Sequence, residues 1–247
     1  RPIDAIRKAE KMRIAGASRQ QIHASTSMML DNSPYAGVTY GADQQPRFEI
    51  DDSTAKMKRA AIPAGKSAFM KDVLDHPEFY KAYPSAAHMT VGRNPSPNGS
   101  QIKGGEVLLS QKQFVGQIVG RDVLRESGKG HLLHENQHHV QDMEGHAPGG
   151  TPSDFAKKYP GDLAKQKMAY LMLAGEQEAE MTRQRAGLTA AQRRKSMPRP
   201  EVPESEQIVL KPGQGVRAKV DMTSLSDAAR GALDTLMNRD VAEGKTV

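Results

Sequence analysis

The segment 131-HLLHENQHHVQDMEG-145 holds four of the chain's eight histidines. Residues 134–138 within it have the spacing H-E-x-x-H. Four residues of an α-helix turn through about 400°, so His134 and His138 lie about 40° apart, one helical turn above each other. Two imidazoles placed in this way can hold one metal ion from the same side. The spacing therefore predicts a helix here, in a fold that brings a further metal ligand from elsewhere in the chain.

The residue after the first histidine of this pattern can sit beside a metal-bound water. A carboxylate there, in this chain Glu135, can take the proton of that water, which is the general-base role that the pattern has in zinc hydrolases. We therefore predict Zn²⁺ as the cofactor and Glu135 as the catalytic base. Catalytic zinc takes three protein ligands, so His131 and His139 are predicted to stay outside the site, with His131 as a weaker alternative because it shares a face with His134. The competing interpretation is a histidine-rich surface helix.

The absence of certain residues from the sequence limits which residue can be the third metal ligand. The chain contains no cysteine, which excludes thiolate ligands, disulfides and a cysteine nucleophile. The pattern H-E-x-x-H-x-x-G-x-x-H is not completed, because Gln141 and Glu144 stand in the places of its glycine and last histidine. The other arrangement supplies a glutamate from a second helix. Residues 161–187 are predicted to form one long helix, and its segment 174-AGEQEAE-180 offers candidates.

Two glutamates of that segment compete for the role of third ligand. Glu176 and Glu178 lie about 200° apart on a helix, so only one of them can face the histidines. Ala174 and Gly175 lie on the side of Glu178, where small residues permit a close approach of the two helices. We therefore favour Glu178 as the ligand, with Glu176 as the alternative ligand or as a group that orients a ligand histidine. Both could equally be solvated helix charges.

Two further side chains are candidates for contacting a substrate or stabilising an oxyanion. His146 stands in the predicted loop 146–154 directly after the motif helix, and Tyr170 lies in the predicted helix 161–187. Both side chains can donate a hydrogen bond. Loop residues near a site are often functional, although His146 could also be an ordinary loop residue.

The rest of the chain has the patterns of short helices and strands, which indicates an α+β class. Ser18 is the predicted N-cap of the second helix, and an Asn-Gly turn predicts that strands 86–93 and 101–110 pair as a hairpin. We predict helices over 3–14, 19–30, 111–145 (interrupted near 127–130) and 223–239, strands over 47–52, 86–93, 101–110 and 208–210, and irregular chain over 53–66 and 191–206.

Composition bounds the remaining classes of function. With 37% hydrophobic and 4% aromatic residues, the chain can build a core, but not one that spans its whole length. No apolar run approaches the ~18 residues of a membrane span, and no signal peptide is visible. The net charge of +6 and the basic residues at 191–195 and 211–219 permit contact with nucleic acid. Because aromatic residues are scarce and no base-reading motif is present, nucleic-acid binding is the weaker hypothesis.

The two motif segments, HENQHHVQDMEGHAPGG and YLMLAGEQEAEM, resemble a known family. It is the zincin-like metallopeptidase domain of the large polyvalent proteins of bacteriophages and related mobile elements, whose pattern looks like H-E-I-Q-H-A-I-Q-x-x-E-G-F-A-R-G-G and then Y-x-x-L-A-G-E-x-E-A-R-N. Segments 47–52, 72–84 and 201–210 also look like the family, so the resemblance covers roughly residues 5–210. His146 and Pro148 stand where Phe and Arg are usual, and Glu180-Met181 replaces Arg-Asn.

The resemblance implies a zincin-like fold, in which a small mixed sheet packs on the H-E-x-x-H helix and a glutamate helix. Residues 1–210 would form this domain, and 211–247 a C-terminal extension with a short amphipathic helix. Carried over by position, His134 and His138 would be zinc ligands, Glu135 the base and Glu178 the third ligand of a metallopeptidase of the gluzincin type.

The resemblance also implies partners and a location. Zincins commonly bind an extended peptide along an edge strand, and the predicted hairpin 86–110 is the candidate edge. The expected partners are a peptide or protein substrate, other virion proteins or a parent polyprotein, since the chain begins at Arg1 rather than at Met. The expected location is the virion and then the cytoplasm of a bacterial host. The alternative is a zinc-binding structural or interaction module without strong activity.

Overall fold

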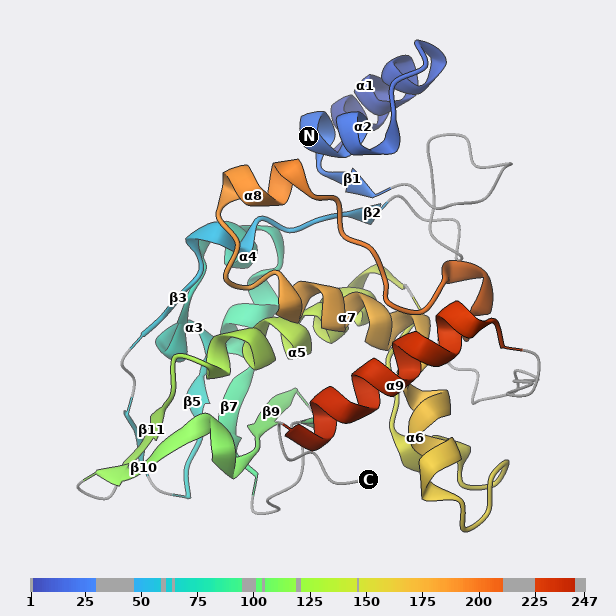
Figure 1. Cartoon of the computed structure of the whole chain (residues 1–247). Coiled ribbons are helices and arrows are strands. Elements are labelled where there is room, and N and C mark those ends of the chain that lie inside the picture. The colour runs from blue at the N-terminus through green and yellow to red at the C-terminus, as the bar shows by residue number, and fades with distance from the viewer. Residues whose placement is uncertain are drawn as a thin grey trace.

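The computed structural model describes residues 2–29, 47–58, 61–63, 65–94, 101–103, 105–118, 121–145, 147–210 and 225–242. Its architecture is α+β, with two central helices beside small sheets (Figure 1). The helices are α1 (Pro2–Ile14), α2 (Arg19–Thr26), α3 (Met70–Val73), α4 (Pro77–Ala82), α5 (Gly128–Glu144), α6 (Leu163–Leu171), α7 (Ala174–Gln184), α8 (Ala190–Lys195) and α9 (Asp227–Ala242). The strands are β1 (Met28–Met29), β2 (Arg47–Phe48), β3 (Lys56–Met57), β4 (Ala61–Pro63), β5 (Ala68–Phe69), β6 (Leu74–Asp75), β7 (Thr90–Arg93), β8 (Gln101–Lys103), β9 (Glu106–Leu109), β10 (Phe114–Ile118) and β11 (Arg121–Leu124).

The two N-terminal helices begin close to the residues predicted from the sequence. Ser18 is the N-cap of α2, as predicted, and the structure shows that it also forms a capping box with Gln21. The helix ends at Thr26 rather than at residue 30, because Ser27 takes a left-handed conformation with φ of 59°. The chain then enters β1, which pairs antiparallel with β2.

A mixed sheet with strand order β5-β7-β9-β8 lies beside α5 (Figure 1). β7 and β9 are parallel, and the other two pairs are antiparallel. The predicted hairpin between 86–93 and 101–110 is therefore wrong. Residues 101–110 instead divide at Gly105, whose φ of 81° makes the turn between β8 and β9. The hairpin is β8-β9, and β7 joins β9 from the other side.

The prediction of helix before residue 127 is also wrong. Residues 114–118 and 121–124 form the antiparallel strands β10 and β11, and β4 pairs with β11 to complete a three-stranded sheet. Valine and isoleucine recur in FVGQIVGRDVL, and its two glycines disfavour a helix. The helix that carries the H-E-x-x-H pattern begins only at Gly128. Part of 53–66, predicted to be irregular, likewise forms the short strands β3 and β4.

The predicted helix 161–187 is divided into α6 and α7 at Met172 and Leu173. Leu173 forms a parallel bridge with Ile208, which is all that the structure shows of the strand predicted over 208–210. The segment 191–206 begins with a helix rather than loop, because Thr189 and Gln192 form a capping box for α8.

Helix α9 confirms the helix predicted over 223–239, with a start four residues later. Its buried residues Ala229, Leu233 and Leu236 share a hydrophobic core with Phe155 and Leu173. Residues 225–242 therefore pack on the helices of the preceding part. Among the helices that the structure describes, none combines the length and the apolar character needed to cross a membrane.

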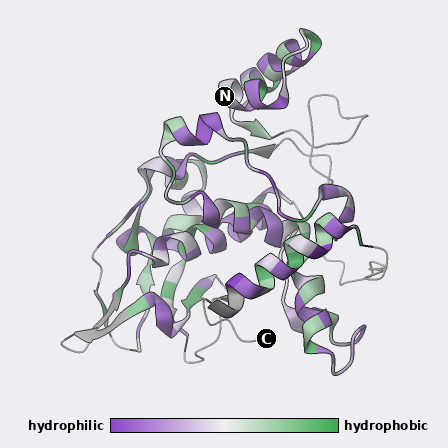
Figure 2. Cartoon of the chain, in the orientation of Figure 1, coloured by the Kyte–Doolittle hydropathy of each residue, from purple (hydrophilic) through white to green (hydrophobic). Residues whose placement is uncertain are grey.

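The central helices carry many hydrophilic residues although they are enclosed (Figure 2). Helix α7 buries Glu176, Glu178 and Glu180 along one short element. Buried carboxylates are costly unless they are paired. The location of these three side chains therefore marks the part of the molecule where a functional site is expected.

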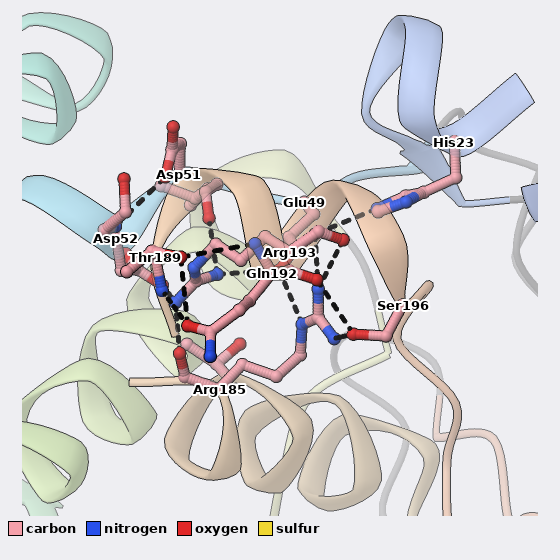
Figure 3. A network of polar contacts seen from close by, with 12 residues as sticks. His23, Glu49, Asp51, Asp52, Arg185, Thr189, Gln192, Arg193 and Ser196 are labelled. Carbon is pink, nitrogen blue, oxygen red and sulfur yellow. Dashed lines mark hydrogen bonds and ion pairs between the residues drawn. The ribbon is translucent and has the colours of Figure 1, made fainter. Parts of the chain in front are cut away.

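A second buried polar cluster holds the far end of α7 (Figure 3). Glu49 accepts hydrogen bonds from Arg185 Nε at 2.6 Å and from Arg193 Nη1 at 2.7 Å. Nε2 of His23 lies 2.9 Å from the same carboxylate, and Asp52 pairs with Arg193 at 3.3 Å. This cluster, which we call the Glu49 network, joins α2, α7 and α8.

Candidate metal centre

His134, His138 and Glu176 come together where α5 packs against α7. Nε2 of His138 lies 3.2 Å from Nε2 of His134 and 3.3 Å from Oε1 of Glu176. Nε2 of His134 lies 3.5 Å from Oε2 of Glu176. Donor atoms about 2.1 Å from a tetrahedral zinc ion are about 3.4 Å apart. The three side chains could therefore hold a metal ion, and their separations suit one of the size of zinc.

The glutamate that the structure groups with the two histidines is Glu176, the alternative that the sequence left open, and not the favoured Glu178. The side of α7 that carries the small residues packs against another segment, because a side-chain carbon on Gly175 would lie 2.5 Å from the backbone of Pro148. Glu178 turns instead toward Gln141 and accepts a hydrogen bond from its amide at 2.8 Å.

Gln141 fixes the orientation of His138. Its amide nitrogen donates to the carbonyl oxygen of Gly175 at 2.9 Å and to Glu178 at 2.8 Å. The amide oxygen therefore faces Nδ1 of His138, at 2.9 Å, and accepts a hydrogen bond from its N–H. This leaves Nε2 of His138 as the nitrogen directed at the cluster. Glu178 thus acts on the site through Gln141.

Two donors hold Glu176 from the other side. The hydroxyl of Tyr170 donates to Oε2 at 2.7 Å, and the backbone N–H of Gly150 donates to Oε1 at 3.0 Å. Gly149 lies so close that a side-chain carbon there would collide with Glu176 Oε1 and with the ring of His138. Tyr170, a sequence candidate for contacting substrate, therefore does lie at the cluster.

Charge coupling dominates the electrostatics of the group. Burial would lower the pKa of His138, but the charge and hydrogen bond of Glu176 and the charge of Glu135 raise it to about 9. Burial would raise the pKa of Glu176, yet the charge of His138 and the hydrogen bond with His134 hold it well below its ordinary value. The metal-free group is therefore an ion pair, and a bound metal ion must displace its proton.

Glu135, His139 and His131 lie outside the three-residue group. Glu135 is buried on α5, and its charge is one of those that raise the pKa of His138. Nε2 of His139 lies 2.9 Å from the hydroxyl of Ser85, and His131 lines a hollow at the start of α5. Neither histidine belongs to the three-residue group. His146 lies outside the described residues.

Glu180 is a neighbour of the site that sequence reasoning did not single out. Its Oε2 lies 4.0 Å from Nδ1 of His134, on the side of the ring away from the cluster. The signal for it was its spacing, since a residue four positions after Glu176 lies on the same face of a helix. With Gln141, Glu178 and Glu180, both histidines of the group have polar side chains on the side away from Glu176.

Comparisons of the chain with protein-family models, with curated proteins and with solved structures find no match.

Proposed function

We propose that this chain is a zinc-dependent metallopeptidase of the gluzincin type, built on a zincin-like fold. The observation that carries the proposal is the close group of His134, His138 and Glu176, next to Glu135 of the H-E-x-x-H pattern. The resemblance of the motif segments to the metallopeptidase domain of phage polyvalent proteins supports the same class. A role in a virion and then in a bacterial host is part of this proposal.

Zinc in a site of two histidines and one carboxylate acts as a Lewis acid that activates water and polarises a carbonyl group. Glu135 would serve as the general base, because it follows a ligand histidine and its charge reaches His138. It would take the proton of the attacking water and pass it to the leaving amine. Gln141 would keep His138 in the orientation that presents Nε2.

Tyr170 is the candidate for stabilising the oxyanion. Its hydroxyl donates to Glu176 Oε2 at 2.7 Å, and it would donate to the oxyanion once Glu176 turns to a bound metal ion. A donor fixed near the place where negative charge develops lowers the barrier of acyl transfer. Loss of this hydroxyl should therefore reduce kcat while zinc remains bound.

The substrate is proposed to be an extended peptide. β9 contacts α5, and β8 beside it is an edge strand of the four-stranded sheet. An edge strand can pair with the backbone of an added peptide. A peptide along β8 would run near the helix that carries Glu135, so the sheet and the metal centre would act together.

The test is metal analysis combined with Glu135→Gln. We expect one zinc ion per chain, removal of zinc by chelators, and cleavage of a peptide library that falls at least about 100-fold in the variant while zinc stays bound. A parent protein without zinc would refute the metal centre. Stoichiometric zinc with no cleavage of any peptide would favour the alternative, a zinc-binding structural module.

A further inference from the structure

The C-terminal helix α9 reaches the surroundings of the metal centre through one side chain. Nη2 of Arg239 lies 2.9 Å from Oε1 of Glu180, and its Nη1 donates to Glu201 at 2.8 Å. Figure 1 shows α9 running across the region of α6 and α7. A residue far along the chain from both motif segments is thus tied to the helix that bears Glu176.

Glu180 is held by several donors, and they differ between its two oxygens. Arg183 pairs with both oxygens, through Nε at 2.7 Å and Nη2 at 2.9 Å. Gln184 and Arg239 both approach Oε1, at 3.2 Å and 2.9 Å. Oε2 is the oxygen that faces Nδ1 of His134. The contacts from Gln184 and Arg239 therefore keep Oε1 turned away and Oε2 turned toward the histidine.

His134 needs such an acceptor. Its Nδ1 is buried and makes no hydrogen bond within the part of the chain that the structure describes. A histidine that binds a metal ion through Nε2 carries a proton on Nδ1, and that N–H is normally donated to a carboxylate, a carbonyl or water. Oε2 of Glu180 lies 4.0 Å away, so a shift of about 1 Å would bring it to hydrogen-bond distance.

Arg239 is well placed to control that shift because its helix is anchored. Leu233 and Leu236, which precede it by six and three residues, are buried in the core that α9 shares with α6. At the start of the helix, the backbone N–H of Ser226 donates to Glu206 at 2.9 Å. The guanidinium therefore comes from a fixed support, with its own side chain 27% exposed.

We propose that Arg239 is a positioning residue of the metal centre, which acts through Glu180 on the ring of His134. Helix α9 would then be part of the functional unit rather than an appendage. The inference rests on the proposed metal site, because its effect is on a ligand histidine. It assigns a role to the C-terminal segment that neither motif segment implies.

The test measures zinc affinity by competition with a chromogenic chelator, and the visible spectrum of the cobalt-substituted protein. We expect Arg239→Ala to weaken zinc binding about 10-fold and to change the cobalt spectrum, since outer groups of this kind tune affinity by about 10- to 100-fold. Arg239→Lys should recover part of the affinity, because an ammonium can still pair with Glu180. The matched control is Asn238→Ala, an exposed neighbour on the same helix, which should bind zinc like the parent.

A double-mutant cycle decides whether the effect passes through Glu180. In a Glu180→Gln background, Arg239→Ala should have little further effect on zinc affinity. Full additivity would overturn the proposal, as would an Arg239→Ala protein that melts earlier but binds zinc with unchanged affinity and spectrum. A parent protein that binds no zinc would overturn the proposed function as well, whereas a zinc-binding parent with insensitive Arg239 variants would overturn this inference alone.

Discussion

Glu176 and Glu178 are two residues apart on α7, but their side chains contact different groups. Glu176 directs both oxygens at the histidine rings, whereas Glu178 holds the amide of Gln141 that in turn orients His138. A direct metal ligand contributes a bond that nothing else replaces. A group that acts through another side chain contributes only the accuracy of its placement.

This division predicts unequal losses of zinc. We expect Glu176→Gln to weaken zinc binding by more than about 100-fold, and Glu178→Gln by about 10-fold, because the second change removes only an outer contact. Competition titrations with a chelator of known affinity measure both. A larger loss for Glu178→Gln than for Glu176→Gln would show that Glu178 is the ligand and that the grouping seen here is not the working one.

A substitution at Gly149 tests the proposed metal site without changing any of its three ligand side chains. A methyl group at this position would overlap Glu176 Oε1 and the ring of His138. We expect Gly149→Ala to lower zinc affinity by about 10-fold or more, while the far-UV circular dichroism stays that of the parent. Gly187→Ala is the matched control, since a side-chain carbon there meets nothing within 4 Å. Equal zinc affinity in the two variants would contradict the close packing of the loop on the site.

The Glu49 network holds α2, α7 and α8 together by buried charges (Figure 3). Burial would raise the pKa of Glu49, but hydrogen bonds from His23 and Arg185, together with the charge of Arg193, outweigh it and lower the pKa. A carboxylate whose pKa is lowered on folding stabilises the protein above its unfolded pKa. That stabilisation is lost as the pH falls through the folded pKa.

The prediction concerns the pH dependence of unfolding. Glu49→Gln should lower the free energy of unfolding by about 3 kcal/mol at pH 7, because it leaves buried arginines without their carboxylate. The difference from the parent should shrink as the pH falls below the ordinary glutamate pKa of about 4.3, because the unfolded parent then takes up a proton that the folded Glu49 resists. Urea unfolding of both proteins at several pH values measures this. A difference that stays constant down to pH 3 would contradict the assignment of the acid-sensitive charge to Glu49.

Elements with strong local signals could be predicted from the sequence, and elements set by distant contacts could not. Ser18 and Gln21 fix the start of α2 locally, and the spacing of His134 and His138 defines a face of α5. The choice of glutamate depended on which segment packs on Gly175 beside Glu178, and the backbone of Pro148 does so. That contact joins positions far apart in sequence, so no pattern within residues 161–187 could reveal it.

The candidate metal centre lies where helices α5 and α7 meet. Helix α5 supplies both histidines and α7 supplies Glu176, and α7 buries three glutamates in a short span. A ligand that binds only the folded state stabilises it by mass action, by about 2.7 kcal/mol at a free concentration 100 times Kd. In this chain a bound metal ion would link α5, which lies beside the mixed sheet, to α7, which Arg239 of α9 contacts.

Zinc should therefore raise the melting temperature of the entire chain. At free zinc about 100 times Kd, the expected shift is about 5–10 °C, from about 2–4 °C per kcal/mol for a chain of this size. His138→Ala should abolish the shift, whereas His139→Ala should keep it, because His139 pairs with Ser85 outside the group. Calorimetry with and without zinc, followed by a chelator, measures the shift and its reversal. Equal shifts in the two variants would mean that zinc binds elsewhere on the protein, because His138 would then contribute no more to zinc binding than His139.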